Sequence, residues 1–279
     1  MPKKFERRKE PLEINSPSNP KIKKIAKLLK DGSERQDEGV IIVDGLREIE
    51  EALKVDWEIL EFFYCSELVE KNKKGPEAKN MVFLSKEAYV LSKKVFEKIS
   101  YKKTPDGFLA VFRYKEKKLE DFKLKNNPLV LVLESVEKPG NLGGIIRTAY
   151  ASGVDLVILN DQKTDFYSPN VIRSSTGFIF SVPLVLASVE ETKKYLKEKN
   201  IPVFLTAIKN AKNYLEVDFK KGGAIIFGTE AFGLSNKWLN GKFTKIKIPM
   251  IDGVDSLNVS VSVGIIVYEA LRQRNIKIK

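Results

Sequence analysis

The first 113 residues alternate short apolar runs with segments whose apolar residues recur at helical spacing. Within residues 21–30, Ile22, Ile25 and Leu28 form an apolar stripe between lysines, which predicts a helix with one basic face. Residues 45–54 predict a second helix. Short apolar runs predict strands at residues 40–43, 59–64, 82–84 and 108–112. This alternation of strands and helices is typical of a small α/β domain.

The second half begins with consecutive apolar residues at 129–133, a run too uniform for a sheet with one solvated face. We therefore expect a central parallel strand there, because parallel strands are covered by helices on both sides. Later apolar runs predict further strands at residues 156–159, 203–205, 224–227 and 245–248. Helical patterns alternate with these runs at residues 142–151, 190–199 and 259–272. The predicted fold of this half is a layered α/β domain around a parallel sheet.

Composition divides the chain into four parts. Residues 1–12 carry several cations and predict a basic arm, which either binds a phosphate backbone or is only a solvated tail. Residues 13–113 form the first predicted domain. Residues 114–127 are charge-rich and weakly patterned, so they predict a linker. Residues 128–279 form the second predicted domain.

The composition also excludes several kinds of active site. The chain of 279 residues contains no histidine, which removes Ser-His-Asp catalysis, Cys-His catalysis and imidazole zinc sites. Cys65 is the only cysteine, and the aromatic residues before it predict a buried strand position rather than a reactive thiol. Proton transfer is therefore left to carboxylates, Arg, Lys, Tyr, hydroxyls or water. We expect no metal site.

Charge points to the class of partner. The formal net charge is +12, from 49 Lys and Arg against 37 Asp and Glu. Such an excess favours nucleic acid, because cations that neutralise phosphates release counterions. A lysine-rich surface can also serve solubility or growth at high temperature. No apolar run approaches the roughly 18–20 residues of a membrane span, and no signal core follows the charged N-terminus, so we expect a folded cytoplasmic protein without a membrane segment.

Two segments of the second half join glycines to polar residues after predicted strands. In residues 137–149, glycines at the start of a helix allow backbone amides to approach an anion, although the segment fits neither G-x-G-x-x-G nor the P-loop. In residues 225–235, a strand runs into a loop that carries Glu230. A carboxylate at this end of a parallel strand is where α/β proteins place ligand contacts. An ordinary turn with Ser235 as the helix N-cap would also explain the second segment.

A third segment, residues 248–262, leads into the last predicted helix. Ser256, Asn258, Ser260 and Ser262 are polar groups beside or within an apolar stretch. Buried polar groups need hydrogen-bond partners. Capping of the helix would explain one or two of these residues. A bound polar ligand would explain the rest.

In order and spacing, the three segments resemble the three motifs of the SpoU or TrmH family of RNA ribose methyltransferases, part of the SPOUT superfamily. The resemblance covers the second predicted domain. The matching residues are Asn141, Gly143 and Arg147; Gly228, Glu230 and Gly233; and the run Ser256, Leu257, Asn258, Val259 and Ser260. The departures are Gly144, Ala231 and Asp255, where alanine, glycine and glutamate are commoner. The polar residues of the motifs are intact.

The first half resembles the accessory substrate-binding domain of the same family, a small α/β fold similar to a ribosomal RNA-binding protein. The matching features are Ser16 and Asn19 ahead of the basic helix, and residues 40–45 followed by Arg47. This likeness favours ribosomal RNA over transfer RNA as the substrate.

The resemblance implies a deep trefoil knot in the second domain, a homodimer formed through that domain, and S-adenosylmethionine as the cofactor. It implies that the reaction is methyl transfer to a ribose 2′-hydroxyl of RNA, which needs positioning and the removal of one proton but no metal. The implied cofactor-binding residues are Thr206, Gly228, Glu230, Ile248, Met250, Leu257, Asn258 and Ser260.

Arg147 is the catalytic arginine that the resemblance implies. A guanidinium has a pKa above about 12, so we assign Arg147 to orienting the phosphate and hydroxyl and to stabilising the developing alkoxide rather than to releasing a proton. Asn141, Glu230, Ser256 and Asn258 are expected to orient Arg147 and the ribose. Arg173 is expected to supply a second basic contact.

Three other functions remain open at this point. A transfer RNA 2′-O-methyltransferase would use the same motifs. A non-catalytic RNA-binding protein would use the basic helix and first domain, with the three segments as structure only. A nicotinamide-dependent dehydrogenase would need a glycine fingerprint and an acidic ribose-binding residue that this sequence lacks.

Overall fold

The structure is a computed structural model that describes residues 10–162, 165–229 and 231–274. The chain forms two compact units, each with its own β-sheet. The first unit comprises Met1–Lys115 and Tyr167–Phe180, and the second comprises Glu116–Phe166 and Ser181–Lys279. A short segment from the second half of the chain therefore belongs to the first unit. Among the described residues, no helix combines the length and the apolar character that a membrane crossing needs.

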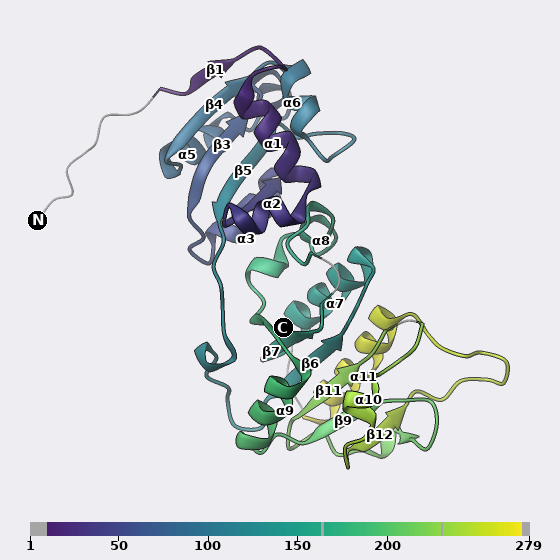
Figure 1. The fold of residues 1–279 in the computed structure, drawn as a ribbon. Coiled ribbons are helices and arrows are strands. Elements are labelled where there is room, and N and C mark those ends of the chain that lie inside the picture. The colour runs from purple at the N-terminus through teal and green to yellow at the C-terminus, as the bar shows by residue number, and fades with distance from the viewer. Residues whose placement is uncertain (1–9, 163–164, 230, 275–279) are drawn as a thin grey trace, which may run out of the picture. The chain divides into compact units, whose positions relative to one another are not determined.

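The first unit is built on a five-stranded mixed sheet in the order β1-β4-β3-β5-β2 (Figure 1). The strands are β1 (Leu12–Ile14), β2 (Val40–Asp44), β3 (Ile59–Tyr64), β4 (Glu87–Leu91) and β5 (Phe108–Arg113). The α-helices are α1 (Pro20–Lys30), α2 (Gly32–Asp37), α3 (Leu46–Leu53), α4 (Ser66–Lys71), α5 (Gly75–Leu84), α6 (Lys93–Ile99) and α8 (Pro169–Ser174). A 3₁₀ turn, η2 (Phe178–Phe180), follows α8. Strand β5 runs antiparallel to both of its neighbours, and the remaining pairs are parallel.

Helix α1 covers one face of this sheet because its apolar stripe is buried. Ile22, Ile25 and Leu28 lie in the core with residues of α6 and of the strands. The side-chain oxygen of Asn19 accepts a hydrogen bond from the backbone N–H of Lys21 at 2.8 Å and so caps the helix. The helix predicted at residues 21–30 is confirmed, as are the predicted strands at 40–43, 59–64 and 108–112.

Two local predictions in the first unit are corrected by the structure. Residues 82–84 are not a strand but the end of α5, and strand β4 follows at Glu87–Leu91. Three apolar residues in a row do not distinguish a helix end from a strand, whereas the buried Ala78 and Met81 have helical spacing. Cys65 is buried as predicted, but it lies between β3 and α4 rather than within a strand.

An aromatic cluster holds the segment Tyr167–Phe180 in the first unit. The ring centroid of Trp57 lies 5.6 Å from that of Tyr167 and 5.2 Å from that of Phe180. Gly177 has φ of +83°, and a Cβ built on it would lie 2.9 Å from the Cβ of Glu51 in α3. Ring packing and this close approach together fix the segment, because a larger residue at Gly177 would push α3 away.

The second unit is built on a seven-stranded sheet in which all pairs are parallel, in the order β10-β12-β9-β11-β6-β7-β8. The strands are β6 (Leu129–Glu134), β7 (Leu156–Asn160), β8 (Leu184–Ala187), β9 (Val203–Thr206), β10 (Lys212–Asn213), β11 (Gly223–Phe227) and β12 (Thr244–Lys247). The helices are α7 (Pro139–Ser152), α9 (Val189–Glu198), α10 (Asn236–Leu239) and α11 (Val259–Gln273), with 3₁₀ turns η1 (Leu119–Asp121) and η3 (Tyr214–Glu216).

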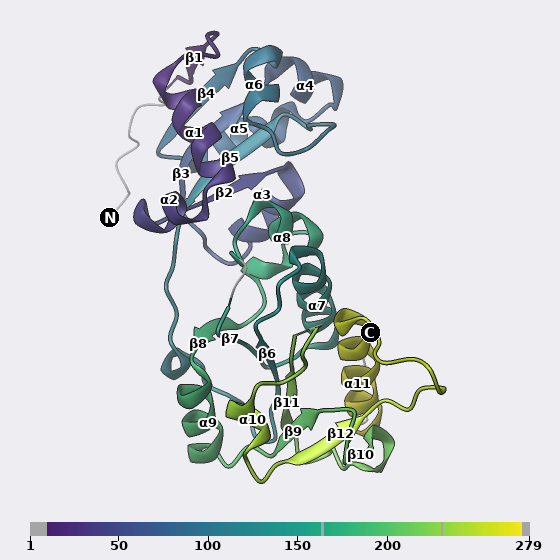
Figure 2. The same ribbon diagram turned by 45° about the vertical axis from the view of Figure 1, so that its right-hand side comes forward.

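Helices cover both faces of this sheet, as the uniformly apolar β6 requires. Figure 2 shows α7 and α11 on one side and α9 and α10 on the other. Val130 and Val132 of β6 pack with Trp238 of α10, which is fully buried. The alternate residues of β6 are also buried, so both faces of the strand lie in the core. The prediction of a central parallel strand at residues 129–133 is confirmed.

Part of the predicted linker packs within the second unit. Leu119 of η1 is buried in the core of that unit, and Phe122 and Leu124 pack against it. The backbone N–H of Lys118 donates to the Asp121 carboxylate at 2.8 Å, which closes the turn. The charge pattern of residues 114–127 concealed this short apolar anchor.

Candidate active site

Four neighbouring strands of the second unit end at one edge of its sheet. In the order β12-β9-β11-β6 they are mutually parallel, so the segments after their carboxyl ends lie at the same edge. Residues 137–149 follow β6, residues 228–235 follow β11, and residues 248–258 follow β12. Thr206 is the last residue of β9. The fold therefore brings the three motif segments to one edge of the sheet.

A hydrogen bond joins the first motif to the third. The side-chain amide of Asn258 donates to Oδ1 of Asn141 at 3.1 Å, although 117 residues separate them in sequence. Helices α7 and α11 pack together behind this contact, and a Cβ built on Gly144 would lie 3.4 Å from the Cβ of Ser260. An alanine at Gly144, as is commoner in the resembling family, would only touch Ser260. The departure at Gly144 therefore leaves the packing of the two motifs intact.

The polar residues of the third motif cap α11. Asn258 Oδ1 accepts from the backbone N–H of Ser260 at 2.9 Å and from its hydroxyl at 2.6 Å, and the Ser262 hydroxyl donates to the backbone carbonyl of Asn258 at 3.2 Å. Hydrogen bonds at the start of α11 thus involve three of these residues, one more than the one or two that capping was expected to explain. Ser256 is exposed and has no hydrogen bond to another described residue.

The second motif forms a tight loop after β11. The backbone N–H of Thr229 donates to the carbonyl of Gly233 at 3.0 Å, and the N–H of Gly233 donates back at 3.1 Å. A Cβ on Gly228 would overlap the backbone of Gly233, so only glycine fits there. Glu230, a predicted site residue within this loop, lies outside the described residues.

Glu134 holds this loop and was missed by sequence reasoning. It is the last residue of β6, only 3% exposed, and its carboxylate accepts from the backbone N–H of Ser235 at 2.8 Å and from the Ser235 hydroxyl at 2.5 Å. The Ser235 hydroxyl therefore donates to Glu134, and the Ser235 side chain makes no capping hydrogen bond to α10. The sequence did offer one signal for Glu134: it is a carboxylate at the end of an apolar run. The ends of such strands form the edge of a parallel sheet at which ligands bind.

The two predicted arginines lie in different units. Arg147 is on α7 of the second unit, is exposed, and makes no hydrogen bond or ion pair with any other described residue. Arg173 is on α8, which belongs to the first unit, and is also exposed. The structure therefore brings Arg147 to the edge that carries Asn141 and Asn258, and it does not place Arg173 in that unit.

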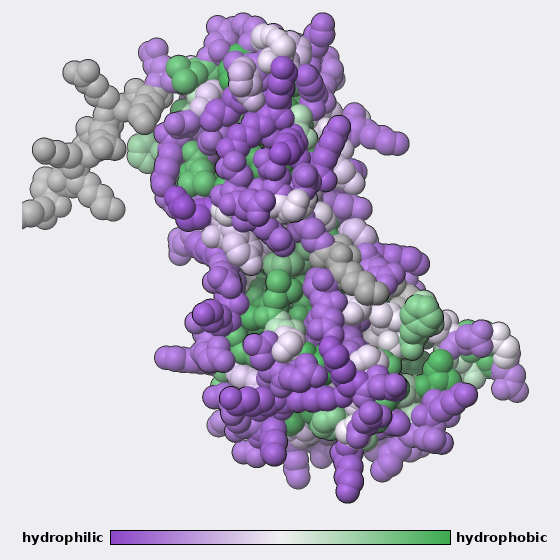
Figure 3. Space-filling model, viewed as in Figure 1, coloured by the Kyte–Doolittle hydropathy of each residue, from purple (hydrophilic) through white to green (hydrophobic). Residues whose placement is uncertain are grey.

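The segment after β12 has free backbone groups that fit a ligand with polar edges. Within the described residues, the backbone N–H and carbonyl groups of Ile248, Met250 and Leu257 make no hydrogen bond. The Thr206 hydroxyl is already used, because it donates to the carbonyl of Ile226 at 2.8 Å. Figure 3 shows patches of hydrophobic surface on the second unit, and Phe232 and Ile251 are among the exposed hydrophobic residues of that unit. Free amides beside apolar surface suit the adenine and ribose of S-adenosylmethionine.

The described residues contain no group of three or more His, Cys, Asp or Glu side chains that could hold a metal ion.

Comparison with known families decides the relationship. The sequence model of the SpoU rRNA Methylase family matches residues 128–268, the stretch that carries all three motifs. The chain belongs to the SpoU rRNA methylase family. A second model, the MRM3-like substrate binding domain, matches residues 19–110 in the first unit. The family resemblance drawn from the motifs is confirmed.

Relatives match over nearly the whole chain. The 23S rRNA (guanosine(2553)-2'-O)-methyltransferase RlmP of Bacillus subtilis (strain 168) is 30% identical over 256 residues, which cover 92% of this chain and 98% of that protein. The crystal structure of an RNA 2'-O ribose methyltransferase is 36% identical with a TM-score of 0.79, covering 95% of this chain and 100% of that one. The SpoU methyltransferase AviRb from Streptomyces viridochromogenes, in complex with AdoMet, is 26% identical with a TM-score of 0.84, covering 92% and 98%.

Proposed function

We propose that this protein transfers a methyl group from S-adenosylmethionine to a ribose 2′-hydroxyl of ribosomal RNA, in the cytoplasm. The observation that carries the proposal is the meeting of the three motif segments at one edge of the sheet, with Asn258 bonded to Asn141 and Arg147 exposed on the same helix as Asn141. RlmP, which is similar over both units, is by name a 23S rRNA 2'-O-methyltransferase. AviRb holds AdoMet in its crystal structure, which supports the same cofactor here.

Arg147 acts on the RNA in this proposal. S-adenosylmethionine supplies an electrophilic methyl group on a sulfonium. The Arg147 guanidinium orients a phosphate of the RNA and the attacking 2′-hydroxyl, and it stabilises the negative charge that develops on that oxygen. Its lack of a partner among the described residues leaves its donors free for this task. The proton leaves through the phosphate or water, because a guanidinium does not release one.

Positioning of both substrates falls to the motif residues. Backbone groups of Thr206, Gly228, Ile248, Met250 and Leu257 hold the cofactor, together with Glu230, Asn258 and Ser260. Asn141, Glu230, Ser256 and Asn258 orient Arg147 and the ribose. The trefoil knot proposed for this domain rests on its membership of the SpoU rRNA Methylase family.

A homodimer through the second domain completes the proposal. Val261 and Tyr268 are seven positions apart on α11, so they share one face of the helix, and both side chains are about half exposed. Tyr150 on α7, the helix that packs against α11, is also half exposed. Exposed apolar side chains on packed helices favour an interface between two copies. Sedimentation of a fully active monomer in the ultracentrifuge would contradict this assignment.

Replacement of Arg147 tests the proposed chemistry. We expect Arg147→Ala to lower the methyl-transfer rate by about a thousandfold, since an electrostatic donor to the developing charge is lost. Calorimetry should show unchanged affinity for S-adenosylmethionine. Arg147→Lys keeps the charge but not the planar fork, and we expect it to remain strongly impaired.

The assay offers ribosomal RNA and transfer RNA separately with labelled cofactor. Label in transfer RNA alone would shift the substrate to transfer RNA. No cofactor binding by the wild-type protein would leave a non-catalytic RNA-binding protein. Unimpaired turnover by Arg147→Ala would refute the role of Arg147.

A further inference from the structure

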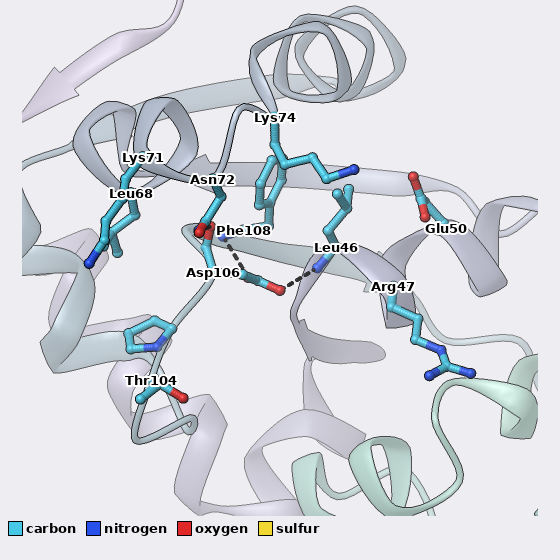
Figure 4. Close-up of a pocket in the computed structure, with 11 residues that line it drawn as sticks. Leu46, Arg47, Glu50, Leu68, Lys71, Asn72, Lys74, Thr104, Asp106 and Phe108 are labelled. Carbon is cyan, nitrogen blue, oxygen red and sulfur yellow. Dashed lines mark hydrogen bonds between the residues drawn. The ribbon is translucent and has the colours of Figure 1, made fainter.

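A pocket of 660 Å³ lies within the first unit. Its walls are the start of α3, the end of α4 with the turn after it, and residues 104–108 (Figure 4). All of these residues fall within 19–110, the range matched by the substrate-binding domain model. The volume is within the range of about 300–1,000 Å³ that ligand pockets occupy in proteins.

A partly buried ionic cluster fixes the wall formed by residues 104–108. The Asp106 carboxylate accepts from the backbone N–H of Leu46 at 3.1 Å, and it pairs with the Lys102 ammonium at 3.2 Å. Lys102 also pairs with Glu48 at 3.2 Å. Burial alone would lower the pKa of Lys102, but the charges of Asp106 and Glu48 raise the pKa overall, so the ammonium stays charged. The pocket is thus held in shape before any ligand binds.

Two cations at the pocket are left unpaired. Arg47 and Lys71 make no hydrogen bond or ion pair with another described residue. Figure 4 shows them on opposite sides of the pocket, with Asp106 and Asn72 between them and Lys74 reaching across above Leu46. Lys74 is already paired with Glu77 at 2.7 Å. Two free cations on either side of a pocket suit two phosphates of one chain.

The space between these cations offers contacts for a base. Leu46 and Leu68 give apolar walls. The Asn72 amide donates to the backbone carbonyl of Asp106 at 3.3 Å, which leaves its side-chain oxygen as an acceptor, and the Glu50 carboxylate makes no hydrogen bond within the described residues. Acceptors of this kind recognise the amino and imino groups of an unpaired base, and proteins read RNA sequence mainly on such unstacked bases.

We propose that this pocket takes one unpaired nucleotide of the RNA substrate, with its base between Leu46 and Leu68 and its flanking phosphates on Arg47 and Lys71. The inference rests on the proposed function for the identity of the RNA. It assigns RNA recognition in the first unit to this pocket.

The test compares two double variants that remove the same charge. The double substitution Arg47→Ala and Lys71→Ala removes the two unpaired cations of the pocket. Lys79→Ala with Lys94→Ala removes two exposed lysines of the same unit that do not line the pocket and have no partner among the described residues. The full-length protein is titrated with transcribed large-subunit ribosomal RNA and with ten-nucleotide oligomers of A, C or U, and binding is followed by fluorescence anisotropy at several salt concentrations. Thermal unfolding confirms that both variants are folded.

We expect the pocket variant to bind RNA about tenfold or more weakly and to lower the salt slope by about 1.4, since each phosphate contact on a single strand contributes about 0.7. The control variant should change affinity by much less. We expect Glu50→Gln to alter the preference among the three oligomers, because it changes an acceptor that faces the base. Equal losses of affinity in the two double variants would overturn the proposal.

Methyl transfer is measured separately, so the two failures can be told apart. If the pocket variant loses RNA binding but the wild-type protein transfers no methyl group, the pocket assignment is supported and the proposed activity is refuted. If methyl transfer is normal in wild type and in the pocket variant at low RNA concentration, the pocket assignment falls and the activity stands.

Discussion

The two units use polar side chains in opposite ways. In the second unit, the polar groups at the sheet edge bind one another: Glu134 holds Ser235, and Asn258 holds Asn141. Arg147 is left without a partner among the described residues. Methyl transfer needs reacting atoms held in one geometry, and a network of satisfied hydrogen bonds supplies that rigidity.

The first unit instead contains both paired and unpaired cations. On α1, Lys21 pairs with Glu61 at 2.9 Å, Lys24 with Glu38 at 2.7 Å and Lys27 with Glu34 at 2.5 Å, whereas Lys23 and Lys30 have no ion pair with another described residue. The cations of the pocket, Arg47 and Lys71, are unpaired. The comparison teaches that the number of lysines on a helix overstates its unpaired charge, because neighbouring carboxylates pair with three of the five lysines of α1. Binding of a flexible polyanion depends on the cations that the fold leaves free.

The first prediction concerns the loop after β11 in the second unit, which a substitution at Gly228 would distort. Gly228→Ala forces a methyl group into the backbone of Gly233. We expect affinity for S-adenosylmethionine to fall about tenfold or more, since overpacking costs about 1–3 kcal/mol and here distorts the cofactor loop. Gly75→Ala is the control, because a Cβ there meets nothing within 4 Å. Calorimetry that finds equal affinity in both variants would show that this loop does not hold the cofactor.

Releasing the same loop at its other end is expected to lower the stability of the second unit. Glu134→Ala leaves the Ser235 N–H without its acceptor, which we expect to cost about 1.5–3 kcal/mol in the free energy of unfolding. Glu134→Gln keeps one acceptor and should cost less. A double-mutant cycle with Ser235→Ala, followed by denaturant unfolding and kinetics, measures the coupling. Additive losses would mean that the carboxylate does not act through Ser235.

The smallest effect concerns the segment that joins the first unit from the second half of the chain. Gly177→Ala and Gly153→Ala both place a side chain at positive φ, but only the former meets a neighbour, the Cβ of Glu51 at 2.9 Å. We expect Gly177→Ala to cost about 1–2 kcal/mol more than Gly153→Ala. Hydrogen exchange should localise the added loss to residues 167–180. Equal costs would indicate that backbone strain alone, and not packing on α3, fixes the segment.

Long and periodic elements of the fold were predictable from the sequence. In strand β6 and in helices α1, α7 and α11, the spacing of the apolar residues is enough to predict the element. Strand β1, with three residues, has too few positions to show a pattern. The end of α5 was mistaken for a strand because three apolar residues fit either period.

The residues of the candidate site also differ in whether the sequence alone could identify them. The motifs identified Asn141, Arg147 and Asn258 because their spacing is fixed along the chain. Glu134 escaped notice because its partner, Ser235, is 101 residues away and pairs with it only in the fold. Arg173 lies in the segment Tyr167–Phe180, which packs in the first unit, and the second basic contact expected of it stays a prediction.

The most direct test of the central claim is the chemical position of the methyl group. Large-subunit ribosomal RNA is incubated with the protein and S-adenosylmethionine labelled in its methyl group, then digested to nucleosides and separated. The account predicts label in a single 2′-O-methylnucleoside, and none with Arg147→Ala. Label in a base-methylated nucleoside would contradict it.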